Sequence, residues 1–509
     1  MKVKRLHLQN YGRFDDLNID FAPTAEKTGN VTVIVGNNGA GKSQILQALA
    51  TGLSWFVNGL LYYTEESVSN TMKHSDTIVF PHEGEYINQH RITKNRDKVD
   101  LGLLFSDMNN EVKGFNLNVT REDILKPAVY GTSDNGFNYL IKKYVEIFES
   151  SKKSSLPLIA NYTIDRNVEI NSIEASYSFV LDQLSAYKDF LNAGSNYDEF
   201  FEWFRDNEDV ENEISKNRTQ SKELDSIENQ LHKLRMEKEV IEEIINDVGT
   251  EKEMFLYRSL AKLTAEIDYK QSEINQFLIR SDMLNASISK GFKSQLDYVR
   301  SAIERFTNFR NIRIRRLNKP TMIVEKNNQE YDINQLSQGE RSLLALVGDI
   351  ARRLVILNPS LDNPLEGEGV VMIDEVDLHL HPKWQHDLID KFVKTFPNVQ
   401  FILTTHSPHV ISDRPDILVY ALDDGELTQV PNIYGEDVNT VLTKVFDVPI
   451  RDPEAQADFD NVAELIYQKN FESAENYIIK LEKQMPENLE LLRCRLHLTQ
   501  AQLAAKKEG

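Results

Sequence analysis

The fold is decided by the stretch Gly36-Asn37-Asn38-Gly39-Ala40-Gly41-Lys42-Ser43. It follows Val31-Thr32-Val33-Ile34-Val35, a nearly all-apolar, β-branched run that is typical of a strand buried on both faces. It precedes Gln44 to Ala50, which consists mostly of good helix formers. A strand, a turn that matches G-x-x-x-x-G-K-[S/T] and a helix in this order predict a loop that binds nucleotide phosphates. They disfavour the alternative, a glycine-rich turn without a ligand.

Each residue type in this loop suits a phosphate. Glycine lets the backbone curl so that N–H groups point at phosphate oxygens, and the start of the helix adds its positive end. Lys42 would reach the β- and γ-phosphates, and Ser43 would offer its hydroxyl to Mg²⁺. The predicted nucleotide contacts are Gly36, Asn37, Asn38, Gly39, Ala40, Gly41, Lys42, Ser43 and Gln44.

A second apolar run ends in two acids, Val370-Val371-Met372-Ile373-Asp374-Glu375. A buried strand that ends in carboxylates places them at the edge of the sheet where ligands bind in α/β folds. We expect Asp374 to hold Mg²⁺ through water and Glu375 to polarise the attacking water. An exposed acidic loop after a strand is the alternative, and the phosphate loop makes it the weaker one.

Two further stretches fit the same site. Ser337 is a good N-cap for a helix that begins near Gly339, and Glu340 stands where a capping box needs it. A capped helix start is also an anion site, so the structural and the functional interpretation are compatible. His406 ends a third apolar run, Phe401-Ile402-Leu403-Thr404-Thr405, one helix and one strand after Asp374. We expect it at the same sheet edge, although an isolated histidine after a strand is usually structural.

The remaining chain divides by composition. From about residue 211 to 290, a dense Glu, Lys, Gln and Asn mixture carries apolar residues at 3-4 spacing in two runs, separated by a break near Gly249. This pattern predicts an antiparallel coiled-coil hairpin with arms of roughly 35–45 Å, with a compact helical insert as the alternative. Beyond Pro431 the apolar spacing is helical, which predicts three or four short helices.

The charge and the cysteine content argue against several classes of protein. Acidic residues outnumber basic ones, 79 to 58, for a net charge of −21, which argues against a surface that clamps nucleic acid throughout but leaves room for one basic groove. The single cysteine, Cys494, excludes intramolecular disulfides and fits a reducing compartment. No apolar run approaches the roughly 18–20 residues of a membrane span. We therefore expect a cytoplasmic protein without a membrane partner.

The order of these stretches resembles that of ABC-type ATPase heads of the SMC, RecF and OLD branch, in which a coiled-coil insert is a hallmark. A closer resemblance is to the PtuA-type ATPases of Septu and retron antiphage systems. It spans most of residues 1–430 and is carried by Trp203-Phe204-Arg205, Gly348-Asp349-Ile350-Ala351-Arg352-Arg353-Leu354 and Asp374-Glu375-Val376-Asp377-Leu378-His379-Leu380-His381-Pro382-Lys383-Trp384-Gln385.

The resemblance implies an α/β fold: an ABC-type P-loop NTPase head with an inserted antiparallel coiled-coil arm and a small C-terminal helical appendage. The expected domains are an N-terminal lobe of the head with the phosphate loop, the arm, a C-terminal lobe of the head and a helical module, at 1–200, 201–295, 296–430 and 431–509.

The resemblance also implies a composite site for ATP and Mg²⁺. The signature residues Ser337, Gln338, Gly339 and Glu340 would meet the γ-phosphate held by a second protomer. His406 would be the switch histidine, and Asp377 would lie in the loop that crosses the interface. The implied partners are a second copy at least, an HNH endonuclease that the ATPase restrains or directs, and a retron reverse transcriptase with its nucleic acid.

Some residues depart from this family pattern or stay ambiguous. Gln338 and Glu340 stand where transporters commonly carry Gly and Gln, a usual variation in the SMC and RecF branch. Gln89 is a weak candidate for the glutamine that contacts Mg²⁺. Arg13 could reach the nucleotide or be a solvated turn residue. A metal pair of His379 and His381 would lack a third ligand.

Rival functions remain open. A RecF- or SMC-like DNA clamp in repair could use Arg310, Arg313, Arg315 and Arg316, although a solvated strand face suits the acidic chain better. An OLD-type enzyme would need its own nuclease domain, and the helical segment after Pro431 is too short for one, so we expect no intrinsic nuclease. A transporter ATPase is the weakest alternative, because it has no place for a coiled-coil arm.

Overall fold

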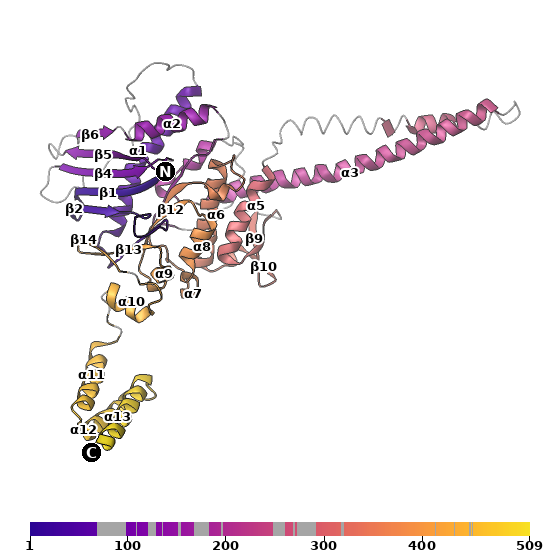
Figure 1. Ribbon diagram of the computed structural model, residues 1–509. Helices are drawn as coiled ribbons and strands as arrows, with labels where there is room; N and C mark the ends of the chain where they lie inside the picture. Colours follow the sequence, from indigo (N-terminus) through magenta and orange to yellow (C-terminus); the bar gives the residue numbers. More distant parts are fainter. Residues whose placement is uncertain are drawn as a thin grey trace. The chain divides into compact units, whose positions relative to one another are not determined.

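The computed structural model describes most of the chain, in two compact units, 1–429 and 430–509. The described residues are 1–68, 98–107, 109–120, 129–134, 136–150, 154–166, 183–194, 197–247, 260–267, 270–271, 292–316, 320–412, 414–431, 433–446, 449 and 451–508. The candidate Gln89 lies outside them. The first unit contains the head and the arm, and the second contains the C-terminal helices (Figure 1).

A six-stranded sheet forms the centre of the head. Its order is β14-β13-β3-β12-β11-β7, parallel throughout except for the hairpin that joins β13 to β14. Every residue of β3, β7, β11 and β12 is buried, which explains their nearly continuous apolar sequences. The strands are β3 Val31–Gly36, β7 Leu158–Tyr162, β11 Gly369–Ile373, β12 Val399–Thr405, β13 Leu418–Asp423 and β14 Glu426–Gln429.

An antiparallel sheet of five strands, β2-β1-β4-β5-β6, packs nearby. Helix α1 (Lys42–Val68) contacts strands of both sheets, and a Cβ at its Gly52 would lie 2.4 Å from Leu103 of β4. Helix α2 (Gly136–Ser150) adds Phe137, which stacks on Phe105 with ring centroids 4.6 Å apart. The strands are β1 Lys2–Tyr11, β2 Phe14–Asp20, β4 Lys98–Ser106, β5 Val112–Thr120 and β6 Val129–Asp134.

The first part of α1 corrects one expectation from the sequence. Residues Lys42–Tyr63 are long and apolar enough to cross a membrane, and 78% of that window is buried inside the protein. The apolar composition of this helix is accounted for by its contacts with the two sheets, because a helix buried on most sides is hydrophobic around its circumference.

Helices α5 (Phe292–Thr307), α6 (Gln338–Leu357) and α8 (Leu388–Thr395) form a further layer with the three-stranded sheet β10-β9-β8. Phe392 of α8 joins this layer to the central sheet, since its ring lies 4.8 Å from Phe401 of β12 and 4.9 Å from Phe306 of α5. The remaining elements here are β8 Arg310–Arg315, β9 Thr321–Lys326, β10 Gln329–Asp332, α7 Pro382–Gln385, α9 Pro408–Ile411 and the 3₁₀ turns Gln183–Tyr187, Phe190–Asn192, Ile333–Gln335 and Pro364–Glu366.

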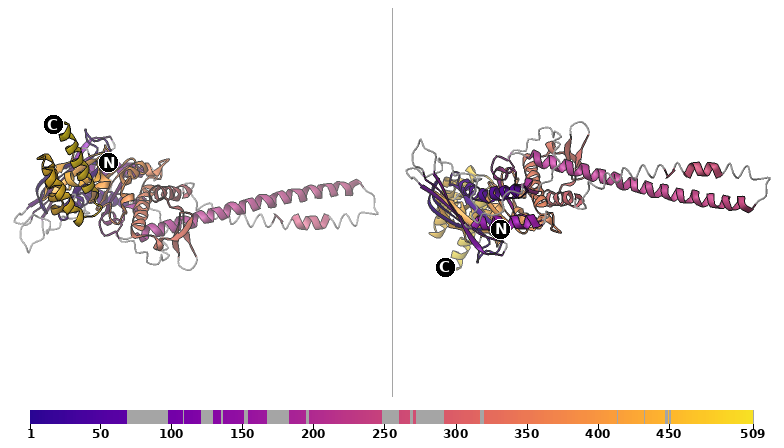
Figure 2. Two further views of the ribbon diagram at one scale, coloured as in Figure 1. Left: turned by 90° about the horizontal axis from the view of Figure 1, so that it is seen from below. Right: turned by 90° about the horizontal axis from the view of Figure 1, so that it is seen from above.

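The arm is built on α3 (Asp198–Asp247), a helix of 50 residues. Its first turns belong to the head, where Phe200 is fully buried against Gly348 of α6, so the helix starts earlier than the composition change suggested. The described part of the returning segment runs beside it (Figure 2), and Arg235 donates to Gln271 Oε1 at 2.9 Å. That pairing is antiparallel, as the two-run pattern predicts.

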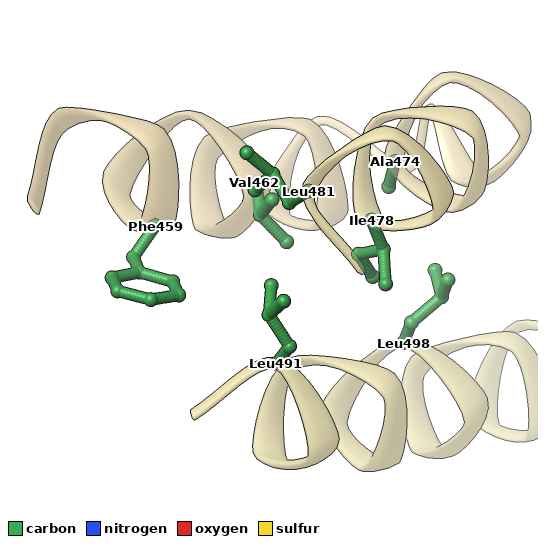
Figure 3. Close-up of a cluster of buried hydrophobic side chains, with 7 residues drawn as sticks. All are labelled: Phe459, Val462, Ala474, Ile478, Leu481, Leu491 and Leu498. Carbon is green, nitrogen blue, oxygen red and sulfur yellow. The ribbon is translucent and has the colours of Figure 1, made fainter. Parts of the chain in front are cut away.

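The C-terminal unit contains α10 (Val438–Val445), α11 (Pro453–Tyr467), α12 (Phe471–Gln484) and α13 (Leu489–Glu508). Three of these helices enclose a small apolar core (Figure 3) formed by Phe459, Val462, Ala474, Ile478, Leu481, Leu491 and Leu498. Asp452 caps α11 through the N–H groups of Glu454 and Ala455, and Asn470 caps α12 through that of Ser473.

Candidate nucleotide site

The predicted phosphate loop joins β3 to α1 at the C-terminal edge of the central sheet. Gly39 and Gly41 have φ values of 78° and 115°, conformations that residues with a Cβ rarely adopt. A Cβ on Gly36 would lie 2.2 Å from the carbonyl oxygen of Leu422, so the loop needs glycine there for space. Lys42 Nζ donates to the carbonyl oxygens of Gly36 at 2.8 Å and Asn37 at 3.1 Å.

Asp374 and Glu375 follow β11 at the same edge. Thr404 of β12 holds them in place, since its Oγ1 donates to Asp374 Oδ1 at 2.5 Å and accepts the Glu375 N–H at 2.7 Å. The Asp374 N–H donates to the Tyr162 oxygen of β7 at 2.8 Å. Asp374 is buried, and Glu375 has a left-handed φ of 45°. Three adjacent strands therefore fix the pair of carboxylates.

Electrostatics link these residues into one cluster. Burial lowers the pKa of Lys42, and the carboxylates of Asp374, Glu375 and Asp377 oppose that shift. Burial and then the positive charge of Lys42 lower the pKa of His406, opposed by the same three carboxylates. The shift favours the neutral form of the His406 imidazole, which can donate one hydrogen bond and accept another.

The stretch Ser337–Glu340 starts α6 with the predicted capping box. Glu340 N–H donates to Ser337 Oγ at 3.4 Å, and Ser337 N–H donates to Glu340 Oε2 at 3.1 Å. Lys326 Nζ lies 2.5 Å from Glu340 Oε1, and this ammonium helps lower the pKa of Glu340, although burial opposes it. Gly339 allows a close approach, because a Cβ there would lie 2.2 Å from the His379 oxygen. Ser337 and Gln338 stay exposed.

Comparison with known proteins now identifies the family. Residues 1–411 match the AAA ATPase domain family. The Retron Ec83 probable ATPase of Escherichia coli is 31% identical over 505 residues, which cover 94% of this chain and 81% of that protein. The Retron Vc95 probable ATPase of Vibrio cholerae serotype O1 biovar El Tor is 33% identical over 422 residues, 81% of this chain and 71% of that protein. The chain is a PtuA-type ATPase of antiphage systems.

Two more distant similarities complete the comparison. The Septu protein PtuA of Bacillus mycoides (strain KBAB4) is 34% identical over 125 residues, 23% of this chain and 17% of that protein. The Smc head domain with an extended coiled coil from Pyrococcus furiosus is 16% identical with a TM-score of 0.40, and the match covers 84% of this chain and 96% of that chain.

The structure adds residues that sequence reasoning missed in the ATPase. Arg166, after β7, is buried and donates to the main-chain oxygens of Asp374 and Glu375. Thr404 was recognised only as part of a strand, yet it binds both residues of the acidic pair. The only sequence signal that could have pointed to Thr404 is that polar residues, Thr404 and Thr405, end a buried strand, and nothing local distinguishes Arg166.

A buried ion cluster explains the run Gly348–Leu354 in the ATPase. Asp349 of α6 accepts from Arg352 at 2.7 Å, from Arg353 at 2.8 Å and from the Tyr162 hydroxyl at 2.8 Å. The two guanidinium groups hold the pKa of Asp349 well below its usual range although burial opposes them. The main-chain oxygen of Tyr162 also accepts the Asp374 N–H. The cluster therefore joins α6 to the strand beside the acidic pair.

Other candidates have different surroundings. Gln44 points at the turn between β1 and β2, where its Oε1 accepts the Arg13 N–H at 3.3 Å. Arg13 is half-exposed and lies 3.8 Å from Asp424. His381 caps α7, with Nδ1 accepting the Lys383 N–H at 3.2 Å. Among the described residues, no group of three or more His, Cys, Asp or Glu side chains could hold a metal ion.

The four arginines at β8 are paired with carboxylates. Arg313 lies 2.6 Å from Glu330, and Arg316 lies 2.6 Å from Asp209 and 2.9 Å from Glu208. Arg310 and Arg315 are 3.3 Å from Glu304 and 3.6 Å from Asp332. Neutralised in this way, the arginines present little net positive charge to a phosphate backbone.

Proposed function

We propose that this ATPase hydrolyses Mg²⁺-bound ATP between two heads and thereby controls an HNH nuclease partner in the cytoplasm. The observation that supports this most is the cluster of Lys42, Asp374, Glu375, Asp377 and His406 beside the phosphate loop. It combines a cation for the phosphates, carboxylates for a metal and a water, and a neutral histidine, which are the parts that phosphoryl transfer needs.

The residues present suit Mg²⁺. It prefers oxygen ligands, keeps several waters and usually binds through one or two carboxylates together with substrate phosphates. The exposed Ser43 hydroxyl and the Asp374 carboxylate, whose Oδ1 is oriented by Thr404, would hold it. When bound, the ion would neutralise charge that develops on the β- and γ-phosphates.

Glu375 would then act on the attacking water. The carboxylate would orient the water and take up its proton as the water oxygen bonds to the γ-phosphorus and the bond from that phosphorus to the β–γ bridging oxygen breaks, so that ADP leaves. His406 would donate a hydrogen bond to the γ-phosphate and accept one from the water, a pair of roles open only to the neutral ring. Lys42 would leave the carbonyl oxygens of Gly36 and Asn37 for the phosphates.

A second head would complete the site. Ser337 and Gln338 are exposed at the start of α6, where N–H groups and the positive end of the helix favour an anion. We propose that these residues, with Gly339 and Glu340, meet the γ-phosphate bound by the other protomer. Asp377 would lie at the junction, held by the Thr405 hydroxyl at 2.5 Å.

The substitution Glu375→Gln tests this function. It keeps the shape of the side chain and removes the proton acceptor, so ATP binding should be retained while turnover falls about 100-fold or more. Steady-state phosphate release and the Kd for a fluorescent ATP analogue measure the two quantities. The exposed Glu426→Gln, on β14, serves as the control and should leave both unchanged. Hydrolysis at the normal rate in Glu375→Gln would refute the assignment.

The C-terminal unit offers a surface for the nuclease. Leu489, Leu492, Leu496 and Leu503 of α13 are 56–76% exposed and share one face by their 3-4-7 spacing. The opposite face of α13 already packs against α11 and α12 through Leu491 and Leu498. An exposed row of leucines on one face of a helix is typical of a surface that packs against a partner.

Charge argues for a different protein as the occupant of this stripe. Helix α13 carries four basic residues and two acidic ones, although the whole chain has a net charge of −21. Arg493 beside the stripe is 72% exposed and lies 3.1 Å from Glu490 of the same helix, so its charge is partly balanced there. A second copy of α13 would bring basic flanks together, whereas an amphipathic helix of the nuclease with acidic flanks would pair with them.

Replacing two stripe leucines tests this docking site. Leu492→Asp with Leu496→Asp should abolish co-purification of the co-expressed HNH nuclease and leave ATP hydrolysis unchanged, because both side chains lie outside the apolar core. Ile479→Asp, which alters an exposed apolar residue of α12, should not affect co-purification. Undiminished co-purification in the double variant, or in a chain without residues 435–509, would exclude this site.

A DNA clamp of the RecF or SMC kind is the alternative. It needs an exposed basic surface, and the β8 arginines are paired with acidic residues. Hydrolysis that DNA stimulates, with a steep dependence on salt concentration, would favour the clamp.

A further inference from the structure

Arg166 is a buried cation whose guanidinium binds main-chain oxygens of the acidic pair, Asp374 and Glu375. Its Nη2 donates to the carbonyl oxygen of Asp374 at 2.8 Å and to that of Glu375 at 2.7 Å. The residue is 6% exposed, and burial lowers the pKa of its guanidinium although three carboxylates nearby oppose the shift. Removing an arginine from water is costly, so its contacts at this place need an explanation.

The backbone at Glu375 supplies that explanation. Its φ of 45° lies in the left-handed region, which L-residues other than Asn and Asp seldom adopt. A residue keeps such a conformation only where its surroundings determine it from several sides. The direction of the Glu375 side chain depends on this backbone conformation, because the Cα–Cβ bond turns with φ.

Hydrogen bonds hold both peptide groups on two sides. The N–H of Asp374 donates to Tyr162 O, and the N–H of Glu375 donates to Thr404 Oγ1. Arg166 binds the carbonyl oxygens of both residues, and the oxygen of Glu375 also accepts the Leu378 N–H at 2.8 Å. Arg166 is thus a single side chain that bridges the two carbonyl groups of the acidic pair.

We propose that Arg166 is a positioning residue for ATP hydrolysis: its guanidinium fixes the Asp374 and Glu375 peptide groups and so aims the Glu375 carboxylate at the attacking water. This inference rests on the proposed role of Glu375. Arg166 itself need not touch the nucleotide. Its loss should therefore slow the chemical step and leave ATP binding nearly intact.

The substitutions Arg166→Met and Arg166→Lys test this role in the full-length chain. In Arg166→Met, kcat should fall by about 10–100-fold, because small misplacements of a reacting group have effects of that size. The Kd for ATP and KM should change by less than about threefold, since uniform binding is unaffected. Arg166→Lys keeps the charge without the rigid guanidinium fork and should recover part of the lost kcat.

Arg205→Met is the matched control for removing a buried arginine. Arg205 lies on α3, is 7% exposed and pairs with Asp206 at 2.9 Å. Its replacement should lower the thermal unfolding midpoint and leave kcat unchanged. If Arg166→Met does not fold, the kcat of Arg166→Lys decides, because that variant retains the buried charge.

Glu375→Gln, measured alongside, separates two kinds of failure. Normal hydrolysis in Glu375→Gln would refute the proposed function. An inactive Glu375→Gln together with an unchanged kcat in the Arg166 variants would refute the positioning role alone. The same conclusion follows if KM rises while kcat is unchanged, or if Arg205→Met loses as much kcat as Arg166→Met.

Discussion

At the scale of a single residue, Lys42 lies inside the loop that we propose binds the phosphates of ATP. Its ammonium donates to the carbonyl oxygens of Gly36 and Asn37 across the loop. The same donors point into a loop whose glycines leave space for phosphate. The flexible four-carbon stem of Lys42 would let the ammonium move from the loop carbonyls to a phosphate.

Lys42→Ala should therefore weaken ATP binding severely. Hydrogen bonds to charged groups contribute about 1.5–3 kcal/mol each, so the Kd should rise by at least about 10–100-fold. Titration with a fluorescent ATP analogue measures this. Lys98→Ala, which removes an exposed lysine beside Asp100, provides the control. Binding at the original affinity in Lys42→Ala would contradict the role given to the loop.

At the scale of a secondary-structure element, helix α6 carries three features of the site and the arm. Its first turn carries the capping box and the exposed Ser337, its middle carries the Asp349 ion cluster, and its surface contacts the first turns of α3. Arg352 also lies 3.8 Å from Glu199 of α3. The root of the arm and the signature residues are thus attached to one rigid helix.

Asp349→Asn should destabilise the first unit strongly. The substitution leaves Arg352 and Arg353 buried without their shared carboxylate, and breaking a buried pair on one side costs about 3–5 kcal/mol. The urea midpoint of unfolding, followed by tryptophan fluorescence, should fall markedly. Asp20→Asn, which breaks a pair with Arg5 that is half-exposed on both sides, should cost about 1 kcal/mol or less. Equal effects of the two substitutions would contradict this account.

At the scale of the whole molecule, the proposed site needs two copies of the chain. Within one chain, the charges that act on Lys42 are those of Asp374, Glu375 and Asp377, while the signature residues bind their own helix and Lys326. A symmetric pairing would offer each phosphate loop the exposed Ser337 of the other head.

Mixing two inactive variants tests this arrangement. Lys42→Ala lacks a working phosphate loop, and Ser337→Arg blocks the signature face. If sites form between chains, an equal mixture should recover about a quarter of wild-type hydrolysis, because half of the loops then meet an intact signature half of the time. The variants measured separately give the baseline. A mixture no more active than that baseline would exclude a site shared in trans.

The sequence by itself predicted the elements whose signals are local. The phosphate loop, the buried strands at β3, β11 and β12 and the capping box at Ser337 each depend on residues within a few positions of one another. Backbone conformation and helix capping are set at that range, so a pattern of neighbouring residues is sufficient to predict them.

Only the tertiary structure determined the contacts that cross the chain. Arg166 reaches residues 208 and 209 positions away, Thr404 reaches the acidic pair from another strand, and the β8 arginines find carboxylates on α3 and β10. The sequence already shows that an arginine carries a positive charge. Whether it faces a carbonyl group, a carboxylate or solvent depends on which distant segments fold against it, because side-chain contacts over such separations have no periodic trace in the sequence.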